Sequence, residues 1–116
     1  MQVQVIGFIP PFEGLDGNFN TIRVGGALAK RVATHDTVLL MNERTKVVFG
    51  AAEVMHVEVG ALREICQNHA NLNHRELSND RDGAPERLFT YLQKIYGPHI
   101  APPEKKACVI FMRRIE

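Results

Sequence analysis

The sequence has few of the features that mark several large protein classes. Its two cysteines, Cys66 and Cys108, are too few for a disulfide framework, and their apolar surroundings are typical of buried free thiols. The longest unbroken apolar run, Ala107 to Met112, falls far short of the roughly 20 residues that cross a bilayer. The stretch Met1 to Val5 places no basic residues ahead of an apolar segment. We therefore expect no signal peptide, no membrane partner and a cytoplasmic protein.

An excess of charge of one sign is also missing. The formal net charge is +1 and the isoelectric point is about 7.9. Such a chain is no polycation, so any binding of nucleic acid requires a local basic patch. Two sequence motifs are absent as well: the glycine-rich loop that binds phosphate and the Gly-x-Ser-x-Gly elbow that carries a nucleophilic serine. The only serine is Ser78.

Metal-ligand spacings are equally scarce. The sequence contains neither Cys-x-x-Cys nor His-x-x-x-His, and His69 and His74 are five residues apart, which does not place them on one helical face. Cys66 and His69 form a possible nucleophilic pair, but both lie on an apolar helical stripe that is better explained as core. We expect no metal and no cofactor.

What is present is the composition of one globular domain spanning residues 1–116, with 45% apolar and 23% charged residues. β-Branched or alternating apolar patterns predict strands over Val3–Ile9, Asn20–Val24, Thr37–Met41, Val47–Val59 and Ala107–Met112. Gly50 within the longest of these indicates a bulge or a sharp twist.

A change to helical periodicity follows the longest strand. Apolar stripes predict a helix from Ala61 to Asn71 and another from Glu86 to Tyr96, which Gly97-Pro98 ends. Ala27–Val32 is expected to form one or two helical turns, and Asn73 with Glu76 resembles a capping box that opens another. Burial is expected for Leu62, Ile65, Cys66, Leu88, Leu92, Ile95 and either Val109 or Phe111.

The order of these elements favours an α+β fold. A strand, a loop, further strands, two or three helices and a returning strand fit a short, mixed or antiparallel β-barrel with helices packed on its side.

Basic residues are grouped along the chain. Arg23 stands alone between apolar Ile22 and Val24, so its side chain points away from theirs, into solvent or into a cleft. Four further basic residues flank the last strand, where they form either one patch or ordinary solvated charges: Lys105, Lys106, Arg113 and Arg114.

From Phe12 onward the chain resembles the ASCH group of the PUA-like superfamily, and within it the small bacterial N4-acetylcytidine amidohydrolases. The segment ending in Arg23 matches the family pattern G-x-K-x-x-[ET]-x-R, and a strand entry and a helix-helix-strand tail follow in the expected order. The matching segments are Asn18–Arg23, Thr34–Leu39, His69–Asn73, Leu92–Pro98 and Val109–Phe111. The resemblance implies a PUA-like barrel with flanking helices.

The family's functional residues are carried over only in part. The family threonine and arginine correspond to Thr21 and Arg23, but Asn18 stands where the family has its lysine and Asn73 where it has its acid–base glutamate. An asparagine neither exchanges a proton near neutral pH nor acts as an amine nucleophile. It retains donors and an acceptor that can bind a base edge or a carbonyl. Only a shifted loop carrying Asp16 or Glu13 would return an acid to the gap.

Three functions follow as hypotheses. The first is a module without amidohydrolase activity that binds RNA or a nucleotide in a cleft, with binding residues Asn18, Thr21, Arg23, Lys30, Arg31, His69 and Asn73. The second is a diverged hydrolase of RNA or modified nucleosides, in which Thr21 is catalytic, or His69 or His74 acts with Arg23. The third is a protein-interaction domain. The oligomeric state is left open.

The replacements at Asn18 and Asn73 predict that the protein does not turn over N4-acetylcytidine. General acid–base help contributes about 100- to 10,000-fold to such reactions, and neither amide supplies it. Incubation with the nucleoside, followed by chromatography for cytidine, measures this. Robust release of cytidine would contradict the prediction and reveal another group in place of the missing base.

Overall fold

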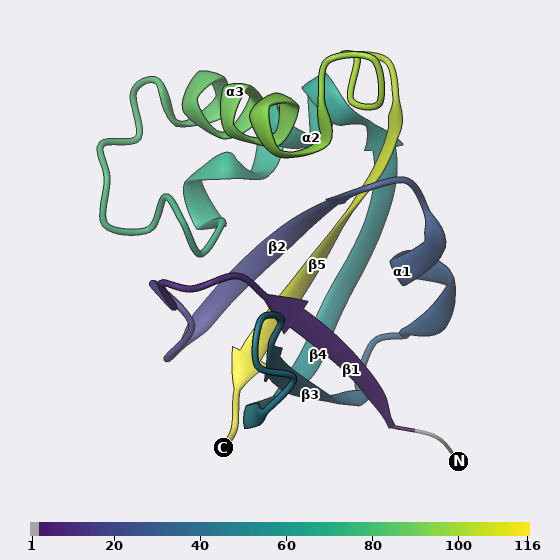
Figure 1. The fold of residues 1–116 in the computed structure, drawn as a ribbon, viewed down its shortest axis with the longest axis vertical. Helices are drawn as coiled ribbons and strands as arrows, with labels where there is room; N and C mark the ends of the chain where they lie inside the picture. The colour runs from purple at the N-terminus through teal and green to yellow at the C-terminus, as the bar shows by residue number, and fades with distance from the viewer. Residues whose placement is uncertain (1–2) are drawn as a thin grey trace.

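The computed structural model describes residues 3–116, and its centre is one five-stranded sheet (Figure 1). The strands are β1 (Gln4–Phe8), β2 (Asn18–Val24), β3 (Thr37–Asn42), β4 (Val48–Ala61) and β5 (Lys106–Arg114). Their order in the sheet is β1-β3-β4-β5-β2, with β1 parallel to β3 and every other pair antiparallel. The helices are α1 (Ala27–Arg31), α2 (Leu62–His69), the 3₁₀ helix η1 (Ala70–Leu72) and α3 (Ala84–Tyr96).

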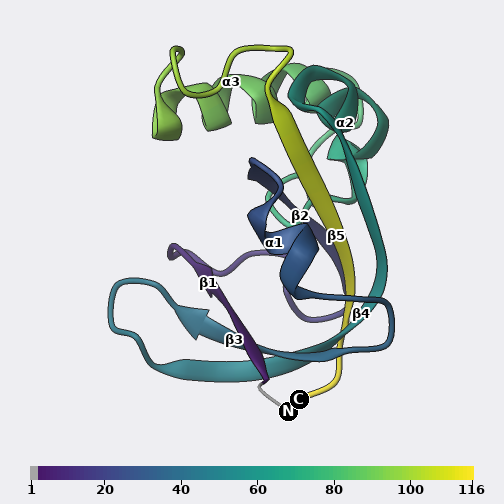
Figure 2. The same ribbon diagram turned by 90° about the vertical axis from the view of Figure 1, so that its right-hand side faces the viewer.

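The sheet curls into a half-barrel because its longest strand bends. The pairing register of β4 shifts at two places. One shift lies beside Gly50, where β4 pairs with Leu40 and Met41 of β3, and the other lies between Val54 and His56, where β4 pairs with β5. Such irregularities bend a strand and increase its twist. Figure 2 shows β1 carried round to lie across the interior from β5. The predicted α+β fold, a small barrel-like sheet with helices on its side, is confirmed.

Strand β5 separates two hydrophobic cores. Its residues Cys108, Ile110 and Met112 belong to the core inside the curl, together with Ile6, Phe8, Phe19 and Val38. The alternate residues Ala107 and Val109 belong to a second core, in which α2 and α3 cover the outer face of the sheet. Successive side chains of a strand point to opposite faces, which explains why the whole run from Ala107 to Met112 is apolar.

Helix α3 starts and stops at glycines. Gly83 precedes it with φ of 82°, Pro85 stands in its first turn, and Gly97 follows it with φ of 89°. Positive φ is a conformation that glycine adopts without steric cost. The predicted end of the helix at Gly97-Pro98 is therefore confirmed.

Two expectations from the sequence are wrong. No helix begins at Asn73, because its side-chain oxygen accepts the backbone N–H of Arg75 at 3.0 Å in a turn, while the Glu76 carboxylate binds Arg87 at 2.7 Å. Asparagine side chains compete for backbone groups in this way. The predicted burial of Ile95 is wrong as well, because this residue faces a solvent-open pocket beside α3 and is 44% exposed.

Among residues 3–116, no helix combines the length and the apolar character that crossing a bilayer requires.

The difference between neighbouring positions of α3 yields a stability test. Leu92 is 5% exposed, so Leu92→Ala should lower the free energy of unfolding by about 2–5 kcal/mol. Ile95→Ala, the matched control on the same helix, should cost about 1 kcal/mol or less. Urea denaturation with equal m-values measures both. Equal losses for the two variants would contradict the packing described above.

Candidate functional site

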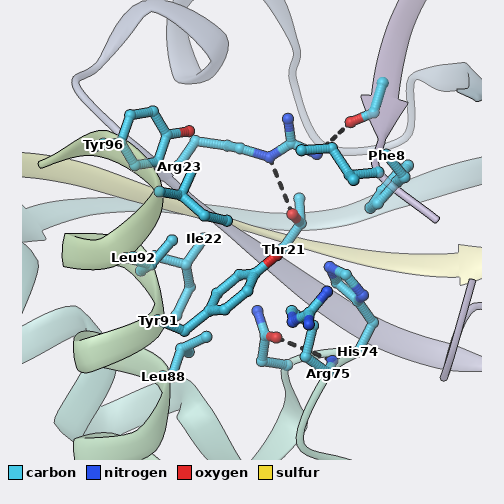
Figure 3. A pocket seen from close by; sticks show the side chains of 14 residues that line it. Phe8, Thr21, Ile22, Arg23, His74, Arg75, Leu88, Tyr91, Leu92 and Tyr96 are labelled. Carbon is cyan, nitrogen blue, oxygen red and sulfur yellow. Dashed lines mark hydrogen bonds between the residues drawn. The ribbon is translucent and has the colours of Figure 1, made fainter. Parts of the chain in front are cut away.

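A pocket opens where the half-barrel fails to close. It lies between the edge strands β1 and β2, the turn 73–75 and one face of α3, is open to solvent, and has a volume of about 90 Å³ (Figure 3). Fourteen residues line it: Gly7, Phe8, Ile9, Thr21, Ile22, Arg23, Asn73, His74, Arg75, Leu88, Tyr91, Leu92, Ile95 and Tyr96. One wall is polar and cationic, and the wall formed by α3 is apolar and aromatic.

Arg23 spans the gap between the two sheet edges. Its Nε donates to the Thr21 hydroxyl at 3.0 Å, and its Nη2 donates to the Gly7 carbonyl oxygen at 2.8 Å (Figure 3). The guanidinium lies 5.1 Å from the centre of the Phe8 ring. Burial lowers the pKa of Arg23 from its usual value, but an arginine remains charged at physiological pH. The pocket therefore has a fixed positive charge in its wall.

The turn 73–75 is fastened to the edge of β2. Asn73 forms a β-bridge with Asn20, and the backbone N–H of His74 donates to the Asn20 carbonyl at 3.1 Å. On its other side the turn contacts Gly14, where φ is 69° and a Cβ atom would lie 2.2 Å from the His74 carbonyl oxygen. Only glycine allows the backbone to approach so closely. Both contacts hold the Asn73 and His74 side chains at the pocket.

His74 is the neutral member of the polar wall. Its ring packs edge-on against Phe8, with centroids 5.1 Å apart, and against Phe19 at 6.2 Å. Burial, and then the positive charges of Arg23 and Arg75, lower the pKa of His74 to about 4. Its Nδ1 is buried and has no hydrogen-bond partner among residues 3–116. The imidazole is therefore uncharged at pH 7.

A second cation faces the aromatic wall. The Arg75 guanidinium lies 3.8 Å from the centre of the Tyr91 ring, between that ring and His74 in Figure 3. None of the fourteen lining residues, all within the described chain, is acidic. The nearby carboxylate of Glu76 is occupied by Arg87, which donates to it from Nε at 2.9 Å and Nη2 at 2.7 Å. The charge of the lining is therefore positive, from two guanidinium groups.

Three of the predicted binding residues line this pocket, namely Thr21, Arg23 and Asn73, and so does His74, a candidate of the hydrolase hypothesis. Asn18 does not line it; it is exposed and pairs with Arg113 of β5. Asn18 lies at the start of β2, three residues and about 10 Å along the strand from Thr21.

The other predicted binding residues lie elsewhere. The His69 imidazole hydrogen-bonds Glu58 at 2.7 Å and packs against Phe111, outside the pocket lining. Lys30 and Arg31 are exposed on α1. Glu13 and Asp16 are exposed too, so neither returns an acid to the pocket.

The basic residues that flank β5 do not form one patch. Lys105 and Lys106 lie at its start and Arg113 and Arg114 at its end, roughly 25 Å away at the usual rise per residue. Arg113 pairs with Glu53 at 2.6 Å, and Arg114 donates to the Leu15 carbonyl at 2.9 Å. We assign these residues the solvated or structural role.

Sequence reasoning missed Arg75, Tyr91 and Tyr96. The two tyrosines belong to the predicted helix and lie on or beside its apolar stripe. This position could have indicated that they line a cleft next to the core. Arg75 carried no signal, because its place at the pocket depends on the turn that Asn73 forms instead of a helix.

Comparison with known proteins shows a likeness of fold. No family model matches the sequence, and no curated protein matches it. A solved structure from Enterococcus faecalis V583, described by the family name DUF984, superposes with a TM-score of 0.65 at 8% identity, over 99% of this chain and 77% of that one. A mutant of ZmASCH from Zymomonas mobilis superposes with a TM-score of 0.55 at 14% identity, over 97% and 71%. The chain therefore has an ASCH-like fold.

Proposed function

We propose that the pocket binds RNA or a nucleotide. The observation that carries the proposal is the pair of guanidinium groups, Arg23 and Arg75, in a lining that contains no acidic residue and has tyrosines on its opposite wall. Arginine presents a planar set of donors that suits phosphate oxygens, and aromatic rings or guanidinium planes stack on unpaired bases. Cationic and aromatic groups together are what a single-stranded nucleic acid requires.

Different side chains of the pocket would contact different parts of the ligand. The guanidinium groups hold phosphate, and Tyr91 with its stacked Arg75 supports a base. The Asn73 amide and the Thr21 hydroxyl add further hydrogen-bond donors and acceptors to the polar wall. Net charge is only +1, so the number of phosphate contacts is small.

We propose that this binding occurs without amidohydrolase activity. No lysine or carboxylate lines the pocket within residues 3–116. His74 is a weak base because its pKa is about 4, far below neutral pH.

A diverged ribonuclease is the second candidate, and one observation favours it: His74 and Arg23 lie in the same pocket. A neutral imidazole can accept a proton from the attacking hydroxyl, and a neighbouring guanidinium can stabilise the negative charge that develops on the phosphate. Cleavage of a labelled RNA by the wild type, lost in His74→Gln, would establish this function in place of simple binding.

Binding is tested by fluorescence anisotropy with short single-stranded RNAs at several salt concentrations. Arg75→Gln should weaken affinity about 10- to 100-fold, the usual range for a charged hydrogen bond, and Arg23→Ala at least as much. Lys105→Ala, an exposed loop residue, should change it little. Affinity should fall with salt on a shallow slope.

Because Arg23 also joins two strands, its variant is compared only after circular dichroism shows that it is folded. Equal losses for Arg75→Gln and Lys105→Ala would remove the pocket from the binding site. No binding at low salt would favour the protein-interaction hypothesis.

The neutral state of His74 has its own test. Its pKa is about 4 in the folded chain and about 6.5 unfolded, so the unfolded chain binds more protons between these values and stability rises with pH across that window. Lowering the pH from 7 to 4 should cost up to about 3 kcal/mol through this group. His74→Gln should remove that part of the slope, while His99→Gln, at an exposed position, should not. Urea titrations at several pH values measure it; an unchanged slope in His74→Gln would contradict burial of a neutral imidazole.

A further inference from the structure

We infer that the pocket takes a terminal phosphate, the phosphomonoester at the end of an RNA or on a mononucleotide, in preference to an internal phosphodiester. This inference rests on the proposed function and specifies its ligand. It depends on three features of the pocket: its size, its charge and its unused hydrogen-bond donors.

The size of the pocket admits a small group. The pocket has a volume of about 90 Å³ and is open to solvent on one side, whereas pockets that engulf whole drug-sized ligands hold about 300 Å³ or more. It is bounded by β1 and β2 on one side and by α3 and the turn 73–75 on the other. An internal phosphodiester would have to bring chain in and lead chain out through this space. A terminal phosphoryl group enters with a single connection to the rest of the ligand.

The charge of the lining matches a monoester. Arg23 and Arg75 supply two positive charges to a lining that has no carboxylate within the described chain. Two carboxylates lie nearby, Glu43 beside Gly7 and Glu76, and these pair with Lys46 and Arg87. His74 adds no charge at pH 7. A phosphomonoester carries about −1.5 to −2 at this pH, which balances two guanidinium groups, whereas a phosphodiester carries −1.

The hydrogen-bond inventory supports the same ligand. Arg23 uses two of its five N–H groups, on Thr21 and Gly7, and the Arg75 guanidinium donates to no residue between 3 and 116. The Thr21 hydroxyl accepts from Arg23, which leaves its own proton free to donate. The Asn73 amide group likewise has no acceptor among the described residues, since its oxygen alone is engaged. These donors line one pocket and suit the several acceptor oxygens of a terminal phosphate.

The experiment compares RNAs of one sequence that differ only at their ends. One pair of short single strands carries a 5′-phosphate or a 5′-hydroxyl, with the dye at the 3′ end. A second pair carries a 3′-phosphate or a 3′-hydroxyl, with the dye at the 5′ end. Anisotropy should show at least tenfold tighter binding for one phosphorylated form, and the two phosphorylated arms identify which end is recognised. The matching nucleoside monophosphate should compete, and the nucleoside should not.

The outcomes separate this inference from the function on which it rests. Equal affinity within both pairs would overturn recognition of a terminal phosphate while leaving RNA binding intact. No binding of any RNA or mononucleotide would overturn both.

Substitutions test whether the pocket is the source of the preference for a terminal phosphate. Arg75→Gln and Thr21→Val should each reduce the affinity ratio between phosphorylated and unphosphorylated RNA toward one, a readout that a general loss of stability does not move selectively. Arg113→Gln, which removes an exposed guanidinium paired with Glu53, should leave the ratio unchanged. A ratio that survives both pocket substitutions would place the phosphate elsewhere on the protein.

Discussion

The hydrogen bond from Arg23 to the Gly7 carbonyl joins two edges of a sheet that does not close on itself. Strands β1 and β2 end the sheet at opposite sides, and curling brings them face to face without a ladder of backbone hydrogen bonds between them. Exposed edges need partners, because unpaired backbone groups are costly when buried and invite other strands when open. Here a side chain supplies one contact across the gap, and the turn 73–75 supplies others along β2. Helix α3 then covers the remaining side.

This way of closing the sheet also creates the candidate site. A side chain that bridges a gap leaves space beside it, and the bridging group is a cation that is partly removed from water. Arg75, held on the Tyr91 ring, adds a second positive charge to the same space. Neither is neutralised by an acidic residue of the lining, so the pocket favours an anion. The contacts that complete the fold and the contacts that we propose for a ligand therefore involve the same arginine.

Predictions from the sequence succeeded where local chemistry decides the outcome. The apolar run that forms β5 has two buried faces, and Gly97-Pro98 ends a helix, whatever surrounds them. They failed where a tertiary partner takes over a side chain. Glu76 pairs with Arg87 instead of capping a helix, and Ile95 lines an open pocket instead of the core. For the candidate site, alternation places Thr21 and Arg23 on one face of their strand, but nothing local places Arg75 beside them or keeps Asn18 outside the pocket.

By itself, the sequence determined the order and type of the main elements, because periodicity and glycine or proline signals act within a few residues. It also determined that the strand positions of Thr21 and Arg23 share one face, since side chains alternate along any strand. Only the tertiary structure decided which face meets the gap, which turn docks against β2, and which residues of α3 complete the wall. Those outcomes depend on contacts between segments as distant as Gly7, Arg23, Arg75 and Tyr91, and pairing at such range is set by the packing of the whole sheet and its helices.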